Sequence, residues 1–193
     1  MENVPISQEF SIQGYVDTFN QYLLSFDYEK MPLGLYRGIM GSAIYLYHQE
    51  RYFQQSDFGR KASSLIDLIY SKLESESDSS LENGLIGIGL GFNYLIMNNF
   101  VEGNINSILS ECDDSIFKSL VQLQQSQGAI RLHDALSMLY HIFYFTVRLQ
   151  SRDLAKHNQF LFQHLICQTI NHIENNYFSE KYEEPIVFSP FSY

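Results

Sequence analysis

Hydrophobic side chains recur every three or four residues along most of the chain between residues 12 and 177, the spacing that places them on one face of an α-helix. Three segments are apolar nearly all round: residues 34–49, 81–99 and 132–149. Helices of this kind are enclosed by protein on most sides. The pattern predicts an all-α fold in which buried helices alternate with amphipathic ones. The amphipathic segments are residues 12–23, 58–74, 104–126 and 155–177.

Short polar connections separate the expected helices, and no stretch has the length or composition of an interdomain linker. Residues 75–80 form an acidic, serine-rich loop in which Ser79 or Ser80 is expected to cap the following helix. Residues 185–191, PIVFSPF, are expected to be extended because they contain two prolines. Residues 1–193 are therefore interpreted as a single domain.

The buried segments contain an internal repeat. Residues 38–41 (GIMG) align with residues 84–87 (GLIG) at a shift of 46, and a further shift of 51 aligns residues 135–138 (ALSM). Each unit then consists of one buried helix followed by one amphipathic helix. A period of about 40–50 residues with two helices in each unit is typical of a helical array.

Glycine costs about 1 kcal/mol relative to alanine inside a helix, so its repeated use needs a structural reason. Two glycines three residues apart share a helix face and let another segment approach the backbone closely. We expect close packing between helix ends at these positions; the alternative is that the glycines leave room for a bound peptide. The glycines concerned are Gly38, Gly41, Gly84 and Gly87.

The segments GLYRGIMGSAIYLYHQ (residues 34–49) and SLENGLIGIGLGFNYLIMNNFVEG (residues 80–103) resemble the first two inner repeats of the lanthionine synthetase C-like proteins. The resemblance implies an α/α toroid, in which an inner ring of helices is wrapped by an outer ring. The chain would correspond to the N-terminal half of that toroid. Cyclases of the family add the thiol of a peptide cysteine to a dehydrated serine or threonine, which forms a thioether ring. A zinc ion held by two cysteines and one histidine activates that thiol.

The chain departs from the family pattern at the zinc site. The family's ligands lie in its C-terminal half and include a Cys-His pair, whereas this sequence has no Cys-His dipeptide. Cys112 and Cys167 stand outside any ligand motif, and Arg131 occupies a position where family cyclases often carry an aspartate. We therefore expect no catalytic residue and no cofactor in this chain, since zinc is expected only in full-length members. Whether the chain is an enzyme is left open by the sequence.

Polar side chains near the starts of the expected inner helices are candidates for a peptide groove. A histidine beside a carboxylate can act as a general base, but for His133 and Asp134 the role of a helix cap is favoured. His164, Cys167 and His172 roughly share a helix face. A metal site there would need a further ligand from another helix, so buried or half-exposed core positions are favoured. The groove candidates are Tyr36, Arg37, Asn83, Arg131, His133 and Asp134.

Composition restricts the function without naming one. The formal net charge of -10 gives no positive surface for nucleic acid or an anionic membrane. The longest nearly continuous apolar run, residues 85–97, falls short of the about 20 residues that span a membrane. Residues 1–10 lack the features of a secretory signal, and two cysteines are too few for a disulfide framework. The predicted location is the cytoplasm.

Two functions follow from the sequence. The first is a lanthionine synthetase C-like protein related to zinc-dependent peptide cyclases but inactive alone, because the half with the zinc ligands is missing. The alternative is a non-catalytic helical-repeat module that binds a peptide or a partner protein. A glycan-processing toroid is disfavoured because only Glu82 and Asp134 place carboxylates near the inner helix starts. Half a toroid would leave residues 132–149 uncovered, so self-association through an apolar edge is also expected.

Overall fold

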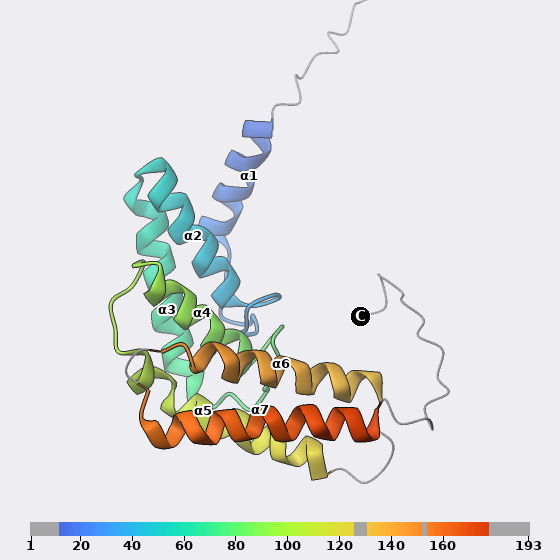
Figure 1. Cartoon of the computed structure of the whole chain (residues 1–193). Helices are drawn as coiled ribbons and strands as arrows, with labels where there is room; N and C mark the ends of the chain where they lie inside the picture. Colours follow the sequence, from blue (N-terminus) through green and yellow to red (C-terminus); the bar gives the residue numbers. More distant parts are fainter. Residues whose placement is uncertain (1–11, 126–130, 152–153, 178–193) are drawn as a thin grey trace, which may run out of the picture.

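The computed structural model describes residues 12–125, 131–151 and 154–177 (Figure 1). Within these ranges the chain forms seven helices and no strand, which confirms the all-α prediction. No helix in these ranges is long and apolar enough to cross a membrane. The segment 185–191, for which proline predicts an extended chain, lies outside the described residues. The helices are α1 (Ile12–Ser25), α2 (Ile39–Phe53), α3 (Ser56–Leu73), α4 (Leu85–Met97), α5 (Ile105–Gln125), α6 (Leu132–Arg148) and α7 (Lys156–Asn176).

Three consecutive helix pairs form two rows. In the first row α2 packs against α4, and α4 packs against α6. In the second row α3, α5 and α7 each pack on the first-row helix that precedes them in the chain. Figure 1 shows that the array bends, with α1 and α2 in one arm and α6 and α7 in the other. The described helices do not close into a ring.

The core lies between the two rows, and α4 is its centre, with ten of its 13 residues buried. Small residues of α4 admit larger neighbours from both sides, because the side chain of Met40 on α2 lies over Gly91 and the ring of Tyr144 on α6 lies over Gly89. The outer row closes the core from behind. The fully buried residues of the core, from both rows, include Ile39, Leu46, Ile69, Ile86, Ile88, Leu95 and Leu109.

The helices α2 and α4 begin later than the hydrophobic pattern predicts. Residues 34–38 and 81–84 form turns and bends. Gly38 and Gly84 are therefore N-caps with extended backbones, at φ −128° and −127°, and not residues of a helix interior. Because a cap position carries no helix-interior penalty, only Gly41 and Gly87 retain the cost that the sequence pattern suggests for all four.

Backbone that folds back from the preceding loop satisfies the first N–H groups of both helices. Ile39 N donates to Pro32 O (2.9 Å), and Leu85 N donates to Asp78 O (2.7 Å). These two hydrogen bonds are 46 residues apart, so the repeat is present in the backbone as well as in the sequence. Neither helix has a side-chain cap at its N-cap glycine. Ser80, one of the two predicted caps, caps the turn before α4 and not the helix itself, because its Oγ accepts from Asn83 N (3.1 Å).

The loops that precede α2 and α4 lie directly on each other. Gly34 N donates to Asn83 O (2.7 Å), and Leu35 N donates to Leu81 O (3.2 Å). A Cβ atom at Gly87 would lie 2.5 Å from Leu35 N, too close for any side chain. The protein's own backbone therefore fills the space beside this glycine, and no room remains there for a peptide. Backbone atoms of Gly34, Leu35 and Asp78 enclose Gly38, Gly41 and Gly84 in the same way.

Two helices, α1 and α6, expose apolar residues. Ala135 replaces a glycine of the repeat, so α6 continues through the position at which α2 and α4 begin, and no described loop folds back over its start. α1 buries only Asn20 and Leu23. We define the α6 stripe as Leu132, Leu136, Leu139 and Phe143, which are 36% to 54% exposed, and the α1 stripe as Ile12, Tyr15, Phe19 and Tyr22, which are 49% to 83% exposed.

The backbone contact at Gly87 leads to a stability prediction. Gly87→Ala should destabilise the protein by about 1–3 kcal/mol, because the new methyl group forces the loop backbone away from α4. Gly14→Ala is the matched control, since an added Cβ atom there meets nothing within 4 Å. Urea unfolding followed by circular dichroism measures both. Equal unfolding midpoints for the two variants would contradict the loop contact.

Candidate functional site

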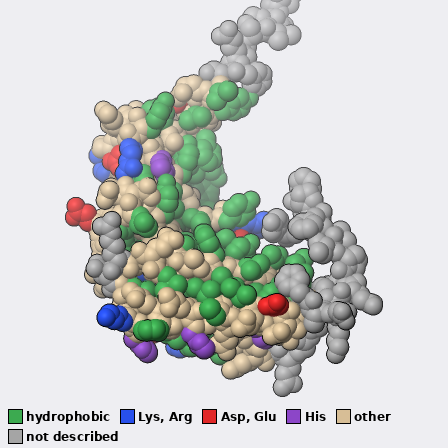
Figure 2. Space-filling model, viewed as in Figure 1, with side chains coloured by type: hydrophobic (Ala, Val, Ile, Leu, Met, Phe, Trp, Pro, Cys, Tyr) green, Lys and Arg blue, Asp and Glu red, His purple; other side chains and the backbone are tan. Residues whose placement is uncertain are grey.

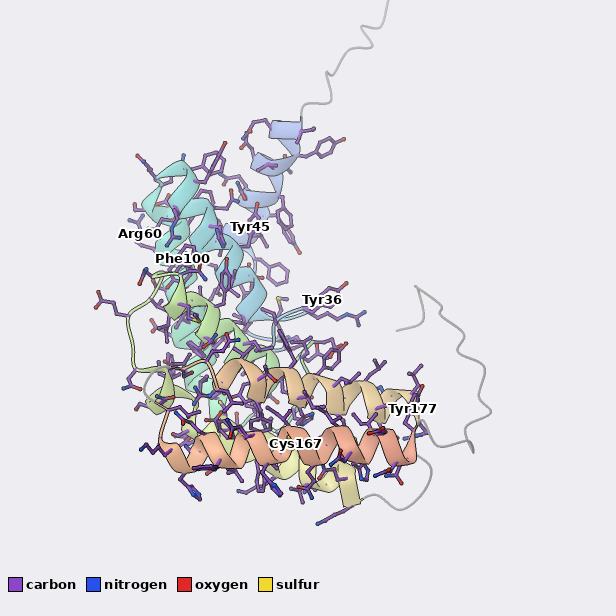
Figure 3. The ribbon with its side chains drawn as sticks, viewed as in Figure 1. Tyr36, Tyr45, Arg60, Phe100, Cys167 and Tyr177 are labelled. Carbon is purple, nitrogen blue, oxygen red and sulfur yellow. The ribbon has the colours of Figure 1, made fainter. Side chains whose placement is uncertain are left out.

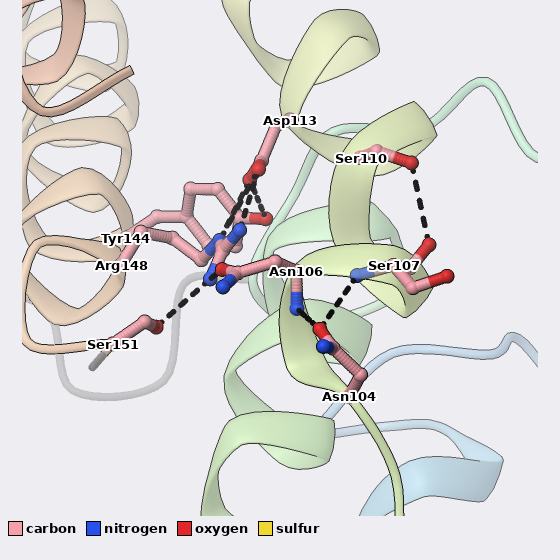
Figure 4. A network of polar contacts seen from close by, with 8 residues as sticks. All are labelled: Asn104, Asn106, Ser107, Ser110, Asp113, Tyr144, Arg148 and Ser151. Atoms are coloured by element: carbon pink, nitrogen blue, oxygen red, sulfur yellow. Dashed lines mark hydrogen bonds and ion pairs between the residues drawn. The ribbon is translucent and has the colours of Figure 1, made fainter. Parts of the chain in front are cut away.

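A buried ion pair joins α5 to α6 (Figure 4). Arg148 Nε donates to Asp113 Oδ1 (2.9 Å), and Arg148 Nη2 donates to Asp113 Oδ2 (2.8 Å). The hydroxyl of Tyr144 donates to the same Oδ1 atom at 2.6 Å. The arginine side chain is 1% exposed and the aspartate 8%. This two-pronged geometry is the strongest form of arginine–carboxylate contact, and it fixes the crossing of the two helices.

The remaining nitrogen of the guanidinium, Nη1, makes hydrogen bonds that hold the C-terminal end of α6 in place. Arg148 Nη1 donates to Asn106 Oδ1 (3.1 Å) and to Ser151 Oγ (2.9 Å). The sequence analysis missed this network, although it left a signal. Asp113 directly follows Cys112 in the apolar stripe of its helix, and a carboxylate in such a position needs a buried cation as partner.

Burial also determines the protonation of the groups around the ion pair. Burial, and next the negative charge of Asp113, raises the pKa of Tyr144 well above its ordinary value of 10.0, so its hydroxyl stays a donor. Burial, reinforced by Asp113 and Glu111, raises the pKa of Cys112 to about 11. A thiol that is protonated at neutral pH is a poor nucleophile and a poor metal ligand, so Cys112 has a structural role.

Three of the predicted groove residues come together at the paired loops. The backbone N–H groups of Tyr36 and Arg37 both donate to Glu82 O, at 3.2 Å and 3.1 Å. Asn83 follows directly, and its Oδ1 atom is buried with no hydrogen-bond partner in the described part of the chain. The side chain of Tyr36 is 74% exposed and points away from the helices (Figure 3). The loop contact therefore presents an exposed aromatic and an exposed cation next to each other.

The other three predicted groove residues lie at the start of α6. Asp134 Oδ2 accepts from the backbone N–H of Arg131 (3.3 Å) and from its Nε (3.2 Å), so the aspartate caps the start of the helix. The cap is the role that the sequence favours for Asp134. His133 is exposed between them. The six candidates therefore form two groups of three, one at the loop pair and one at the N-terminus of α6.

A second cluster links the far ends of α2 and α4. His48 Nε2 and the hydroxyl of Tyr94 are 2.7 Å apart, and these residues occupy equivalent positions in the repeat, 46 apart. The guanidinium of Arg51 lies over the ring of Phe100 at 3.6 Å from its centroid. The sequence alignment of the repeats pairs the histidine with the tyrosine but gives no sign that they touch.

No group of three or more His, Cys, Asp or Glu side chains converges on a metal position in the described part of the chain. His164 and Cys167 are exposed on α7, and His172 is half-buried. His164 and His172 line a groove of about 370 Å³ between α5 and α7, together with glutamine side chains. The favoured buried or half-exposed core position is therefore found for His172, whereas it is wrong for His164 and Cys167, which are exposed.

Comparison with protein-family models, curated proteins and solved structures finds no match for this chain. The resemblance to the lanthionine synthetase C-like proteins therefore depends on the sequence of residues 34–49 and 80–103 alone.

One buried histidine is only half satisfied. His141 has no exposed surface, its Nδ1 lies 2.7 Å from Ser137 O, and its Nε2 has no hydrogen-bond partner among the described residues. A carbonyl oxygen only accepts, so Nδ1 carries the proton and Nε2 is the bare nitrogen. Burial lowers the pKa of His141 below its ordinary value of 6.5.

The ion pair predicts that removing one partner lowers the free energy of unfolding much more than replacing both partners with apolar residues. Arg148→Met should destabilise the protein by about 3–5 kcal/mol, because it leaves the Asp113 carboxylate buried without a cation. Asp113→Leu combined with Arg148→Met should recover most of that loss in urea unfolding experiments. Arg131→Met is the matched control, since its ion pair with Asp134 is exposed and contributes at most about 1 kcal/mol. A double variant as unstable as the single one would contradict this account.

His141 predicts a loss of stability in acid. Because its folded pKa is lowered, the unfolded chain binds more protons as the pH falls below 6.5, so its contribution to stability is present above that value and lost below it. The free energy of unfolding should therefore fall between about pH 7.5 and about pH 5.5. His141→Asn should flatten this dependence, whereas the exposed His157→Asn should leave it unchanged. A wild-type profile that is retained in His141→Asn would refute the prediction.

Proposed function

We propose that this chain is a lanthionine synthetase C-like protein that binds a peptide in the hollow of its helical array and forms no thioether by itself. The observation that supports this best is the doubled backbone motif, in which the loops before α2 and α4 make equivalent hydrogen bonds and lie on each other. The motif falls within the segments that resemble the family, residues 34–49 and 80–103. The equivalent hydrogen bonds support the internal repeat more strongly than glycine spacing alone does.

The proposed family brings with it an α/α toroid. Two features support this proposal: the inner row α2, α4 and α6, and the outer row α3, α5 and α7. In each pair the outer helix follows its inner helix in the chain, as the repeat requires. We propose that these three pairs are about half of such a ring.

The proposed peptide site is the hollow between the two arms. Figure 2 shows this hollow between the arm with α1 and α2 and the arm with α6 and α7. Tyr36 projects toward it from the loop pair (Figure 3), and Arg37 is the next residue. Tyrosine and arginine are the residue types that most often dominate the energy of protein and peptide interfaces. The exposed loop pair is therefore the part of the hollow best suited to hold a peptide.

The chemistry of thioether formation requires a thiolate, which zinc supplies in the family's cyclases when bound. In the described part of the chain Cys112 is held protonated by burial, and Cys167 lies exposed on the outer helix α7. Neither cysteine lies on the inner row. We therefore propose that the chain contributes peptide binding and that cyclisation needs zinc ligands from elsewhere.

Peptide binding is tested with a fluorescently labelled peptide that carries one cysteine and one dehydroalanine. Fluorescence anisotropy should show saturable binding that weakens about tenfold in Tyr36→Ser or Arg37→Ser, the effect of one lost interface residue. Tyr52→Ser is the matched control, because Tyr52 is 80% exposed at the opposite end of α2. Equal affinities for all variants would place the peptide elsewhere, and the absence of binding would refute the proposed function.

The same peptide tests for cyclisation. Addition of its thiol would form a sulfur–Cβ bond and move the thiol proton to Cα of the dehydroalanine, so the mass stays constant and the free thiol disappears. Iodoacetamide should therefore still alkylate the peptide fully after incubation with the protein and added zinc. Metal analysis after dialysis should find less than one zinc per chain. A peptide that resists alkylation would show that the chain is a cyclase, and stoichiometric zinc would show that the chain holds the metal without further ligands.

A further inference from the structure

The first-row helices α2 and α4 are each covered by the segment that follows their pair in the chain. After α2 and α3 the chain returns as α4, which packs against α2, and after α4 and α5 it returns as α6, which packs against α4. For α6 the corresponding segment begins after α7, at residue 178, outside the described residues. The order of the array therefore assigns residues 178–193 to the side of α6 that carries the exposed α6 stripe.

The last described residue lies next to the start of that stripe. α7 packs against α6 and runs back along it, so Tyr177 lies beside the N-terminal end of α6 (Figures 1 and 3). The α6 stripe begins there, at Leu132, and ends about 17 Å further along the helix, at Phe143. Two packed helix axes are about 8–10 Å apart, which residues 178–184 can cross. Residues 185–193 then reach up to about 30 Å, more than the length of the stripe.

The sequence of residues 185–193, PIVFSPFSY, has the chemistry that an apolar helix face requires. It contains no charged residue, and five of its nine residues are isoleucine, valine, phenylalanine or tyrosine. Removing these side chains and the leucines of the α6 stripe from water together is favourable. The two prolines have no backbone N–H, so an extended segment here has fewer donors to leave unpaired against an apolar surface.

Charge favours the same path. Residues 178–184 contain three glutamates and one lysine, a net charge of -2. They precede the apolar run and therefore pass the start of α6, where the side chain of Arg131 is 77% exposed and His133 is exposed beside it. Because the whole chain has a net charge of -10, most of its surface repels an acidic segment, and an exposed arginine attracts one.

We propose that residues 185–193 pack in an extended conformation along the α6 stripe of the same chain. The tether favours this occupant over a second copy, because a short linker gives the segment a high effective concentration at the stripe. The contact covers an apolar surface that would otherwise mark an interaction site. This proposal does not depend on peptide binding, because it follows from the open end of the array and from the sequence of the segment.

A fluorescent reporter in the segment tests the contact. The chain contains no tryptophan, so Phe188→Trp introduces a single one. In the full chain this tryptophan should emit at shorter wavelength, and acrylamide should quench it less, than in a synthetic peptide of residues 185–193 with the same substitution. Adding Leu136→Glu or Leu139→Glu should bring both readings to the peptide's values, because a carboxylate on the stripe opposes the apolar contact.

Ile170→Glu is the matched control, because Ile170 is an apolar residue that is 47% exposed on α7, outside the stripe, and it should leave both readings unchanged. Leu136 and Leu139 are 43% and 48% exposed, so their substitution leaves the core intact, and circular dichroism checks this. A tryptophan as exposed in the full chain as in the peptide would overturn the proposal. So would protection that survives both α6 substitutions, since the segment would then pack elsewhere. Protection that increases with protein concentration would overturn it in favour of a contact between two copies.

Discussion

The contact between the loop of residues 34–37 and the loop of residues 81–84 constrains the rest of the array. It is made of backbone against backbone, at hydrogen-bond distance, so side chains can neither adjust it nor replace it. Gly87 is required because the loop lies where its Cβ atom would be. The contact fixes how α2 and α4 start relative to each other, and the packing of α3 and α5 behind them follows. Because the backbone N–H groups of Tyr36 and Arg37 are held in this contact, the side chains of both residues are exposed at the loop.

The helices of this fold are predictable from the sequence because the apolar positions repeat with helical spacing over most of the chain. The starts of α2 and α4 are not, because Leu35 and Leu81 continue the apolar pattern although their backbone is committed to the loop contact. Glycine at a helix start and glycine inside a helix look alike in a sequence. Only the hydrogen-bond partner of each backbone N–H distinguishes the two cases. The acceptors, Pro32 O and Asp78 O, lie seven residues before the donors, Ile39 N and Leu85 N.

The predicted site residues were recoverable only where local rules decide their role. Asp134 caps the start of α6 through a bond to a residue three positions away, which is a short-range pattern visible in the sequence. The partnership of Asp113 and Arg148 spans 35 residues and depends on how α5 crosses α6. Hydrophobic spacing carries no information about that crossing. The same limit applies to His141, whose burial follows from the neighbours of α6 and not from its own segment.

The third unit of the repeat shows how one residue type changes the edge of the array. At Gly84 the helix begins and the preceding loop folds back, which covers the helix start and offers backbone groups to the neighbouring loop. At the equivalent Ala135 the helix continues, because alanine favours it, and a helical turn stands where the loop would be. In a turn of helix the backbone N–H and C=O groups are already hydrogen-bonded within the helix, so only side chains are available for contact with a neighbour. Any neighbour on this side of α6 therefore has to bind through apolar side chains, and the leucines of the α6 stripe supply them.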